Sequence, residues 1–126
     1  MRRTGPTQAV RDGVYGRDGL ACTLCGSTYP LTLQHRRSRG MGSTRRPETN
    51  QAANLVTLCG SGTTGCHGYV EANPDIARGR GYRVDQQTDP ALVPIIWHGQ
   101  WVWLADDLSV TPLGAGELAD LDGGAA

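Results

Sequence analysis

The hydrophobic positions in the first third of the chain follow two different periods. Val10 and Val14 are four residues apart within residues 8–17, and Gly19 follows them, which predicts a short helix over this segment. In residues 31–35, LTLQH, apolar and polar side chains alternate one by one. A period of two predicts a strand that has a histidine at its end.

A second strand and two short helices come after a long polar segment. Residues 36–53 are rich in Arg, Gly, Ser and Thr and have no hydrophobic period, so they predict a loop. Residues 54–59, NLVTLC, are short and rich in branched side chains, which favours a strand. Residues 66–73, CHGYVEAN, predict a helix of two turns, and Asn73 with Pro74 is typical of the start of another short helix.

The last third of the chain predicts a β-hairpin and an irregular tail. Residues 92–97 and 101–104 are apolar and aromatic, and they flank a His-Gly-Gln sequence that suits a turn. From about residue 113 onward Gly, Ala and Asp dominate, so we expect a flexible acidic tail.

Length and composition limit the chain to one small domain. It has 126 residues, of which 38% are hydrophobic, 18 are Gly and none is Phe, so apolar burial alone supplies little stability. No apolar stretch comes after the basic N-terminus, and the longest apolar run, residues 93–97, is far shorter than the roughly 18–20 residues that span a bilayer. We therefore expect a cytoplasmic protein with no membrane partner and with a source of stability besides its core.

The formal net charge of zero hides a strong asymmetry along the chain. All 12 basic residues are Arg and lie within residues 1–83, which contain five acids and so carry a charge of +7. Residues 84–126 contain seven acids and no Arg, which gives −7. Such a split favours a nucleic-acid-binding segment followed by an acidic one.

Four cysteines are candidates for the additional stability. Cys22 and Cys25 form a CxxC pair followed by Gly26, and Cys59 and Cys66 form a second pair with six residues between them. In a reducing compartment this pattern favours metal ligands, and four thiolates hold a tetrahedral zinc ion. The alternatives are two disulfides or unpaired core thiols. A structural zinc ion would fix the CxxC segment, the second strand and the following helix to one another.

Two histidines and an asparagine lie at the ends of these predicted strands and helix. His35 ends the first strand, Asn54 opens the second, and His67 follows Cys66 at the start of the helix. Because adjacent helical residues point about 100° apart, Cys66 can face the zinc ion while His67 faces another site. Through CTLCG, LTLQHRRSRGMG, ANLVTLCG and GCHGYVEANPD, within residues 22–81, the sequence resembles the HNH endonuclease family, particularly small HNH proteins of tailed bacteriophages.

The resemblance implies an α+β fold, in which a small ββα-metal HNH core is held together by a zinc ribbon and carries an additional C-terminal β-hairpin. It implies a metal-dependent DNA endonuclease or nickase that hydrolyses phosphodiester bonds to a 5′-phosphate and a 3′-hydroxyl. His35 would be the general base that takes a proton from water, a task that suits an imidazole. His67 would bind a catalytic divalent ion (Mg, Mn, Ni or Zn), and Asn54 would hydrogen-bond across the loop to orient the base.

Gln34 departs from the family pattern. The family usually has His or Asp before the catalytic histidine, as a second ligand of the catalytic metal, whereas this chain has Gln34. An amide oxygen can bind a hard cation, but as a neutral ligand it binds more weakly than a carboxylate. We therefore expect Gln34 to be a weak ligand that makes the catalytic site dependent on high metal concentration or impairs it.

The loop between the two strands carries a cluster of arginines. Five guanidinium groups fall within eleven residues that contain no acid, and they belong to Arg36, Arg37, Arg39, Arg45 and Arg46. The alternative is a solvated loop that keeps the protein soluble. Because the cluster joins two candidate catalytic residues, we expect these arginines to contact the DNA phosphate backbone, for which the planar guanidinium is suited.

These segments divide the chain into four parts. We expect a basic N-terminal arm with a short helix over 1–19, the zinc-bound HNH nuclease core over 20–83, a hairpin extension packed on the core over 84–112, and a flexible acidic tail over 113–126.

Two other functions are compatible with the same residues. A noncatalytic zinc-ribbon DNA-binding module would use the cysteines and arginines, with His35 and His67 incidental. An interaction protein of a phage packaging complex would dock through its acidic C-terminal part. Because phage HNH proteins of this kind are thought to act with the terminase, the resemblance implies a terminase subunit as partner and, for a phage-encoded protein, the bacterial host cytoplasm as location.

Overall fold

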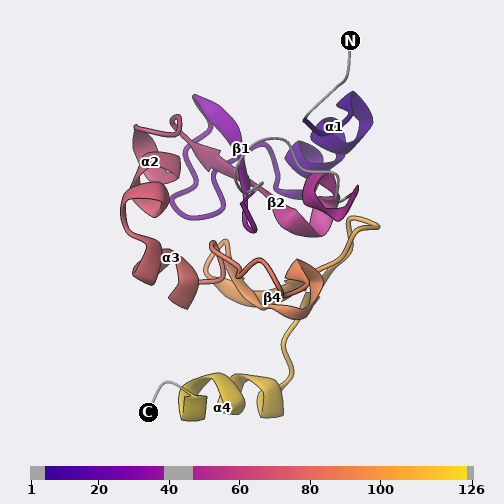
Figure 1. Ribbon diagram of the computed structural model, residues 1–126, viewed down its shortest axis with the longest axis vertical. Helices are drawn as coiled ribbons and strands as arrows, with labels where there is room; N and C mark the ends of the chain where they lie inside the picture. The colour runs from indigo at the N-terminus through magenta and orange to yellow at the C-terminus, as the bar shows by residue number, and fades with distance from the viewer. Residues whose placement is uncertain (1–4, 39–46, 125–126) are drawn as a thin grey trace.

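The computed structural model describes residues 5–38 and 47–124 (Figure 1). Within these residues the fold is mixed α+β, with four α-helices and two small antiparallel sheets. No helix in the described ranges has the length and apolar character needed to cross a membrane. The elements in chain order are α1 (Gln8–Arg17), β1 (Leu31–His35), β2 (Leu55–Cys59), α2 (Gly65–Ala72), α3 (Pro74–Gly79), β3 (Ile95–Trp97), β4 (Gln100–Leu104), β5 (Val110–Pro112) and α4 (Ala115–Gly124), with 3₁₀ turns at Pro47–Asn50, Ala52–Asn54 and Pro90–Leu92.

The elements predicted for the first 81 residues are confirmed to within one or two residues. Helix α1 and strand β1 have the predicted bounds, and β2, α2 and α3 come in the predicted order. Local sequence explains the start of α1, because the Thr7 hydroxyl accepts a hydrogen bond from the Val10 amide at 3.2 Å and so caps the helix.

Strands β1 and β2 form an antiparallel hairpin in which His35 lies opposite Leu55 and Gln34 lies opposite Val56. Successive side chains of a strand point to opposite faces, and paired residues share a face. The Leu55 face packs against α1 in a small cluster around Val14. The Val56 face packs into the main core. The side chains of Gln34 and His35 therefore leave the backbone on opposite faces of the hairpin, at the same end of β1.

The main core joins the hairpin to the C-terminal half of the chain. Its buried side chains come from the CxxC segment, β2, α2, α3, and the sheet of β3 and β4, which lies across from the hairpin in Figure 1. Burial of apolar surface shared by all these elements stabilises them together. The buried members are Cys22, Val56, Leu58, Val70, Ala77, Tyr82, Ile95, Val102 and Leu104.

The C-terminal part is more regular than the sequence predicts. β3 pairs with β4 as an antiparallel hairpin, and β5 adds a third strand. Where we expected a flexible tail, Ala115–Gly124 form helix α4, which Figure 1 shows set apart from the rest of the molecule. Glu117 in its first turn accepts hydrogen bonds from the Gly114 amide at 2.8 Å and the Trp103 indole at 3.3 Å. These contacts order the start of a helix that its Gly-rich sequence does not favour.

Candidate functional site

The four cysteines converge on one point of the structure. Their Sγ atoms all lie within 4.8 Å of one another, although the residues come from the CxxC segment, the end of β2 and the first turn of α2. The Sγ atoms of Cys25 and Cys59 are 3.6 Å apart. A tetrahedral ion with metal–sulfur bonds of about 2.3 Å requires sulfur–sulfur distances of about 3.8 Å. The cluster could therefore hold a structural metal ion, and all four residues are free cysteines without a disulfide.

The backbone around the sulfurs is shaped to stabilise thiolates. The amide of Cys25 donates to Cys22 Sγ at 3.5 Å, and the amide of Cys66 donates to Cys59 Sγ at 3.4 Å. Each turn is closed by a glycine with positive φ, at 82° for Gly26 and 89° for Gly60. A Cβ at Gly60 would overlap the Thr64 carbonyl oxygen, so this turn needs glycine.

The thiols differ in their tendency to ionise. Burial opposes ionisation of Cys22, but backbone hydrogen bonds from its neighbours outweigh burial and lower the pKa of Cys22 below its ordinary value. Burial, and then the neighbouring thiols, raise the pKa of Cys66. A positive ion among the sulfurs would allow all four to be thiolates at neutral pH, so metal binding at this cluster would release protons.

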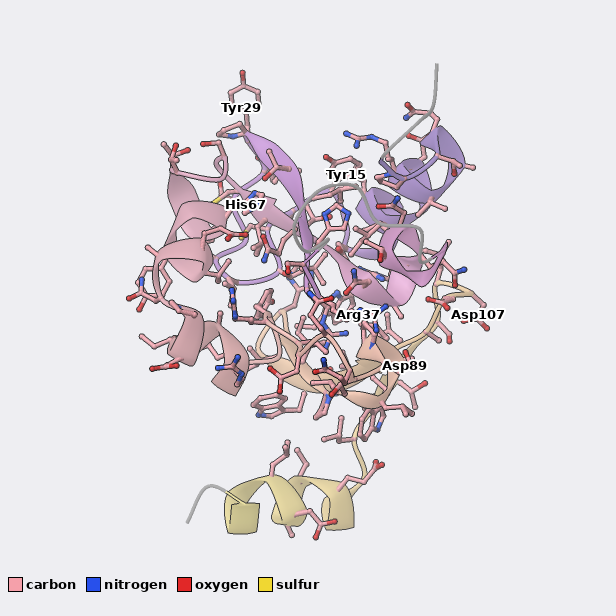
Figure 2. The ribbon with its side chains drawn as sticks, in the orientation of Figure 1. Tyr15, Tyr29, Arg37, His67, Asp89 and Asp107 are labelled. Atoms are coloured by element: carbon pink, nitrogen blue, oxygen red, sulfur yellow. The ribbon has the colours of Figure 1, made fainter. Side chains whose placement is uncertain are left out.

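The His67 ring is held in one orientation on the inner side of α2 (Figure 2). Its Nδ1 is 2.7 Å from the hydroxyl oxygen of Thr32, and that hydroxyl donates to the Leu58 carbonyl at 3.3 Å. The ring therefore donates from Nδ1 and has its lone pair on Nε2, as metal-binding histidines do. Burial lowers the pKa of His67, which favours the neutral ring that can bind a cation.

Glu71 is the acidic neighbour of this ring. Its Oε1 lies 3.8 Å from His67 Nε2, one helical turn further along α2. Sequence reasoning missed Glu71, although its spacing of four residues from His67 was an available signal. In the described part of the chain, only the four cysteines form a group of three or more His, Cys, Asp or Glu ligand atoms this close together. His67 and Glu71 therefore offer two ligands to a second ion, and further ligands would have to come from groups such as Gln34.

The His35 ring is bound by a residue that the sequence did not single out. His35 Nε2 is 2.9 Å from the side-chain oxygen of Asn50. An amide oxygen only accepts hydrogen bonds, so His35 donates from Nε2, and the neutral ring has its lone pair on Nδ1. A general base needs such a lone pair. Asn50 is fifteen residues from His35 across the loop, and no local pattern connects the two.

The Asn54 side chain hydrogen-bonds to the backbone on both sides of the loop between β1 and β2. Its side chain is buried, with 1% exposure, and its Oδ1 accepts from the Arg37 amide at 2.6 Å. Its Nδ2 donates to the carbonyls of Arg37 at 3.0 Å and Thr49 at 2.8 Å. Thr49 precedes Asn50, so Asn54 is hydrogen-bonded to the backbone next to the residue that contacts His35.

A pocket of about 160 Å³ opens at the end of β1. Gln34 and His35 both reach it, although they begin on opposite faces of the hairpin. The Gln34 side chain is 6% exposed, and its Oε1 is buried without a hydrogen-bond partner in the described structure. Such an oxygen is available to a cation or to a donor. The pocket is lined by Gln34, His35, Arg36, Ser38, Arg78, Arg83, Val84, Asp85 and Gln86.

Arg36, which the sequence placed among the DNA contacts, lies inside the fold. Its side chain is 1% exposed, and its guanidinium donates to four backbone carbonyls, those of Gly81 at 2.8 Å, Ala53 at 2.9 Å, Pro90 at 3.1 Å and Val93 at 2.7 Å. Burial lowers the pKa of Arg36 to about 9, which leaves it charged at neutral pH. Arg36 therefore links segments of the protein, and its donors do not face a phosphate.

Arg37 is also buried, at 4% exposure, and it donates to the Thr88 carbonyl at 3.0 Å. Figure 2 shows it near the middle of the molecule. This position argues against direct contact of Arg37 with DNA. The remaining arginines of the predicted cluster, Arg39, Arg45 and Arg46, lie outside the described residues.

No protein family, curated protein or solved structure matches this chain.

Proposed function

We propose that this protein is a metal-dependent DNA endonuclease or nickase of the HNH type. One observation carries the proposal: a β-hairpin and helix, joined by a four-cysteine cluster, hold His35 at the end of β1, Asn54 across the loop and His67 on α2. This is the order of elements and residues that the resemblance implies for a ββα-metal site. We assign zinc to the cysteine cluster, because zinc takes four thiolates in tetrahedral geometry without redox chemistry.

The proposed reaction is hydrolysis of the P–O3′ bond by water. His35 takes a proton from water through Nδ1, while Asn50 holds the opposite side of the ring. The water oxygen bonds to phosphorus as the P–O3′ bond breaks, and the leaving 3′ oxygen takes a proton from solvent water, which gives a 5′-phosphate and a 3′-hydroxyl; His35 then returns its proton to solvent. His67 would hold the catalytic divalent ion (Mg, Mn, Ni or Zn). Gln34 is a proposed weaker ligand of this ion, and Glu71 is the acidic group next to His67. When bound, that ion would neutralise the scissile phosphate and stabilise the leaving oxygen.

Replacement of the proposed base tests this function. We expect His35→Ala to reduce plasmid cleavage by roughly 10²- to 10⁴-fold, the usual contribution of a general base. Cleavage would be measured on supercoiled plasmid with zinc-loaded protein in magnesium, manganese or nickel. DNA binding should persist in the variant.

His98→Ala is the matched control, because His98 is an exposed histidine in the turn after β3. It should cut like the wild type. Equal activity of His35→Ala and wild type would contradict the assignment of the base. Inactivity of the wild type in every metal, with DNA binding retained, would favour the noncatalytic zinc-ribbon module.

The role of Gln34 can be tested at the level of metal binding. We expect Gln34→Asp to tighten binding of Mn²⁺ to zinc-loaded protein, because a carboxylate binds a hard cation better than an amide does. Isothermal calorimetry gives the affinity. Gln87→Asp is the matched control, since it makes the same charge change at an exposed position that does not line the pocket. Equal affinities of Gln34→Asp and the control would show that Gln34 is not a ligand.

DNA is the proposed substrate, with Arg39, Arg45 and Arg46 as proposed backbone contacts from the loop. A phage terminase subunit is the proposed partner, on the resemblance alone. Co-purification of the full chain with a terminase subunit tests that partnership and would also be the expected result for a packaging-complex interaction protein. Plasmid cleavage separates the two functions, because only the nuclease requires His35.

A further inference from the structure

The backbone of Arg83 is fixed at the rim of the pocket that His35 also lines. Its neighbours Tyr82 and Val84 are both buried, at 0% and 6% exposure, while the Arg83 side chain points outward and is exposed. The Val84 amide donates to the Arg36 carbonyl at 2.8 Å, which fixes this segment alongside the end of β1. Gly81, with φ of 85°, packs so closely on Pro94 and Ile95 that a Cβ there would overlap the Pro94 carbonyl oxygen. The backbone that carries Arg83 therefore has little freedom to move.

The Arg83 guanidinium makes no hydrogen bond or ion pair with any described residue, although it lines a pocket. A second guanidinium, from Arg78 on α3, lines the same pocket. Arg78 is partly neutralised, because it lies 3.1 Å from Asp85 and 3.8 Å from Asp75. Arg83 is thus the pocket guanidinium that has no partner among the described residues, whereas the buried Arg36 guanidinium donates to backbone carbonyls and Arg78 is shared with exposed carboxylates.

The rest of the lining indicates which anion would fit. Its residues include neither Trp nor Tyr, so nothing there would stack on a base. Ser38 and Gln86 also line the pocket, and Gln86 Nε2 donates to the Ser38 hydroxyl oxygen at 2.9 Å. Two arginines without an aromatic partner suit the phosphate of a nucleic-acid backbone, which is recognised independently of sequence.

We propose that Arg83 and Arg78 form a binding site for a backbone phosphodiester of DNA at the end of β1, directly beside His35. This inference rests on the proposed function for the identity of the DNA, and it places the strand on the α3 side of the hairpin. In this proposal Arg83 and Arg78 make the phosphate contacts that the sequence led us to expect from Arg36 and Arg37, whose side chains are buried. Local sequence patterns do not indicate it, because Arg78 and Arg83 lie more than forty residues after His35.

The test compares Arg83→Ala with Arg80→Ala. Arg80 is also exposed and lies three residues earlier, but it lines a different pocket, with Thr23 and Leu24. Binding of a fluorescein-labelled DNA duplex to zinc-loaded protein would be measured by anisotropy, without added divalent ion, over a range of salt concentrations. We expect Arg83→Ala to weaken binding about tenfold, the change expected for one lost hydrogen bond to a charged group. The slope of log K against log salt should fall by about one.

Arg80→Ala should change the affinity for DNA much less. The loss of affinity in Arg78→Ala should lie between these two, because the Arg78 guanidinium is paired with Asp85. Equal effects of Arg83→Ala and Arg80→Ala would overturn the site and indicate diffuse attraction instead. So would an absence of DNA binding by the wild type.

The outcome for the site is separable from that for the nuclease. If the wild type never cuts plasmid but Arg83→Ala still binds DNA more weakly than Arg80→Ala, the phosphate site stands and the nuclease proposal fails. If the wild type cuts in a His35-dependent way and the two Arg variants bind alike, the nuclease proposal stands and the phosphate site fails.

Discussion

Removal of the zinc ion that we assign to the four cysteines should unfold the protein. Structural zinc ions bind with an apparent free energy of about 10–16 kcal/mol in small zinc-binding peptides, which equals or exceeds the total stability of about 5–15 kcal/mol that is typical of a domain. The cluster joins the CxxC segment, β2 and α2, so without an ion these elements lose their common attachment. Circular dichroism during titration with a chelator should show loss of structure, and added zinc should restore it.

Cys59→Ser makes the same test without a chelator. Cys59 accepts a hydrogen bond from the Cys66 amide and lies 3.6 Å from Cys25 Sγ, so its loss removes one ligand and one stabilised turn. We expect substoichiometric zinc by elemental analysis and a large fall in melting temperature. Thr111→Ala, an exposed change on β5 whose side chain makes no hydrogen bond in the described part of the chain, is the control and should behave like the wild type. Full stability of zinc-free wild type would favour disulfides or unpaired thiols instead.

Asp18→Ala should be the most damaging change outside the cysteine cluster. Asp18 is 0% exposed, and its carboxylate accepts from Arg17 at 2.7 Å, the Thr57 amide at 2.8 Å and the Trp97 indole at 2.9 Å. It therefore connects α1, β2 and β3. Truncation leaves the Arg17 charge buried without its partner, which typically costs about 3–5 kcal/mol. Urea unfolding followed by tryptophan fluorescence would measure the loss.

Asp12→Ala is the matched control, because Asp12 lies on the exposed side of the same helix and, among the described residues, accepts a hydrogen bond only from Gln8. It should change the free energy of unfolding by no more than about 0.5 kcal/mol. If Asp18→Ala does not accumulate in folded form, Asp18→Asn supplies a milder version, in which one oxygen acceptor remains. Equal stability of Asp18→Asn and Asp12→Ala would contradict the role assigned to the buried carboxylate.

The sequence predicted the local elements of the site well, because their signals are local. The alternation in residues 31–35 and the spacing of Val10 and Val14 depend on neighbours in the chain, and the strand and helix that they predict appear in the structure. The cysteine cluster was also predictable, since the chemistry of four thiols limits their arrangement to few options. Strand β5 and helix α4 were missed, because Pro112 and the Gly-rich tail disfavour regular structure locally.

The roles of the arginines could not be predicted from their positions. Arg36 and Arg37 belong to a run of charges of a kind that normally faces solvent. The carbonyls that accept hydrogen bonds from the Arg36 guanidinium, however, belong to residues 17 to 57 positions away in the sequence. The bond from His35 to Asn50 likewise depends on the path of a loop. Tertiary contacts of this kind have no period in the sequence, so local patterns do not reveal them.

The four carbonyls around Arg36 make the proposed nuclease segment inseparable from the C-terminal third of the chain. Two of them, those of Pro90 and Val93, lie beyond residue 84, and the Tyr82 hydroxyl also donates forward, to the Ile96 carbonyl at 2.7 Å. A transplant of residues 20–83 into another protein would carry the histidines and cysteines but leave a buried guanidinium with half of its acceptors missing. We therefore expect residues 20–83 not to fold alone, because the acidic part of the sequence supplies part of the scaffold around the basic part.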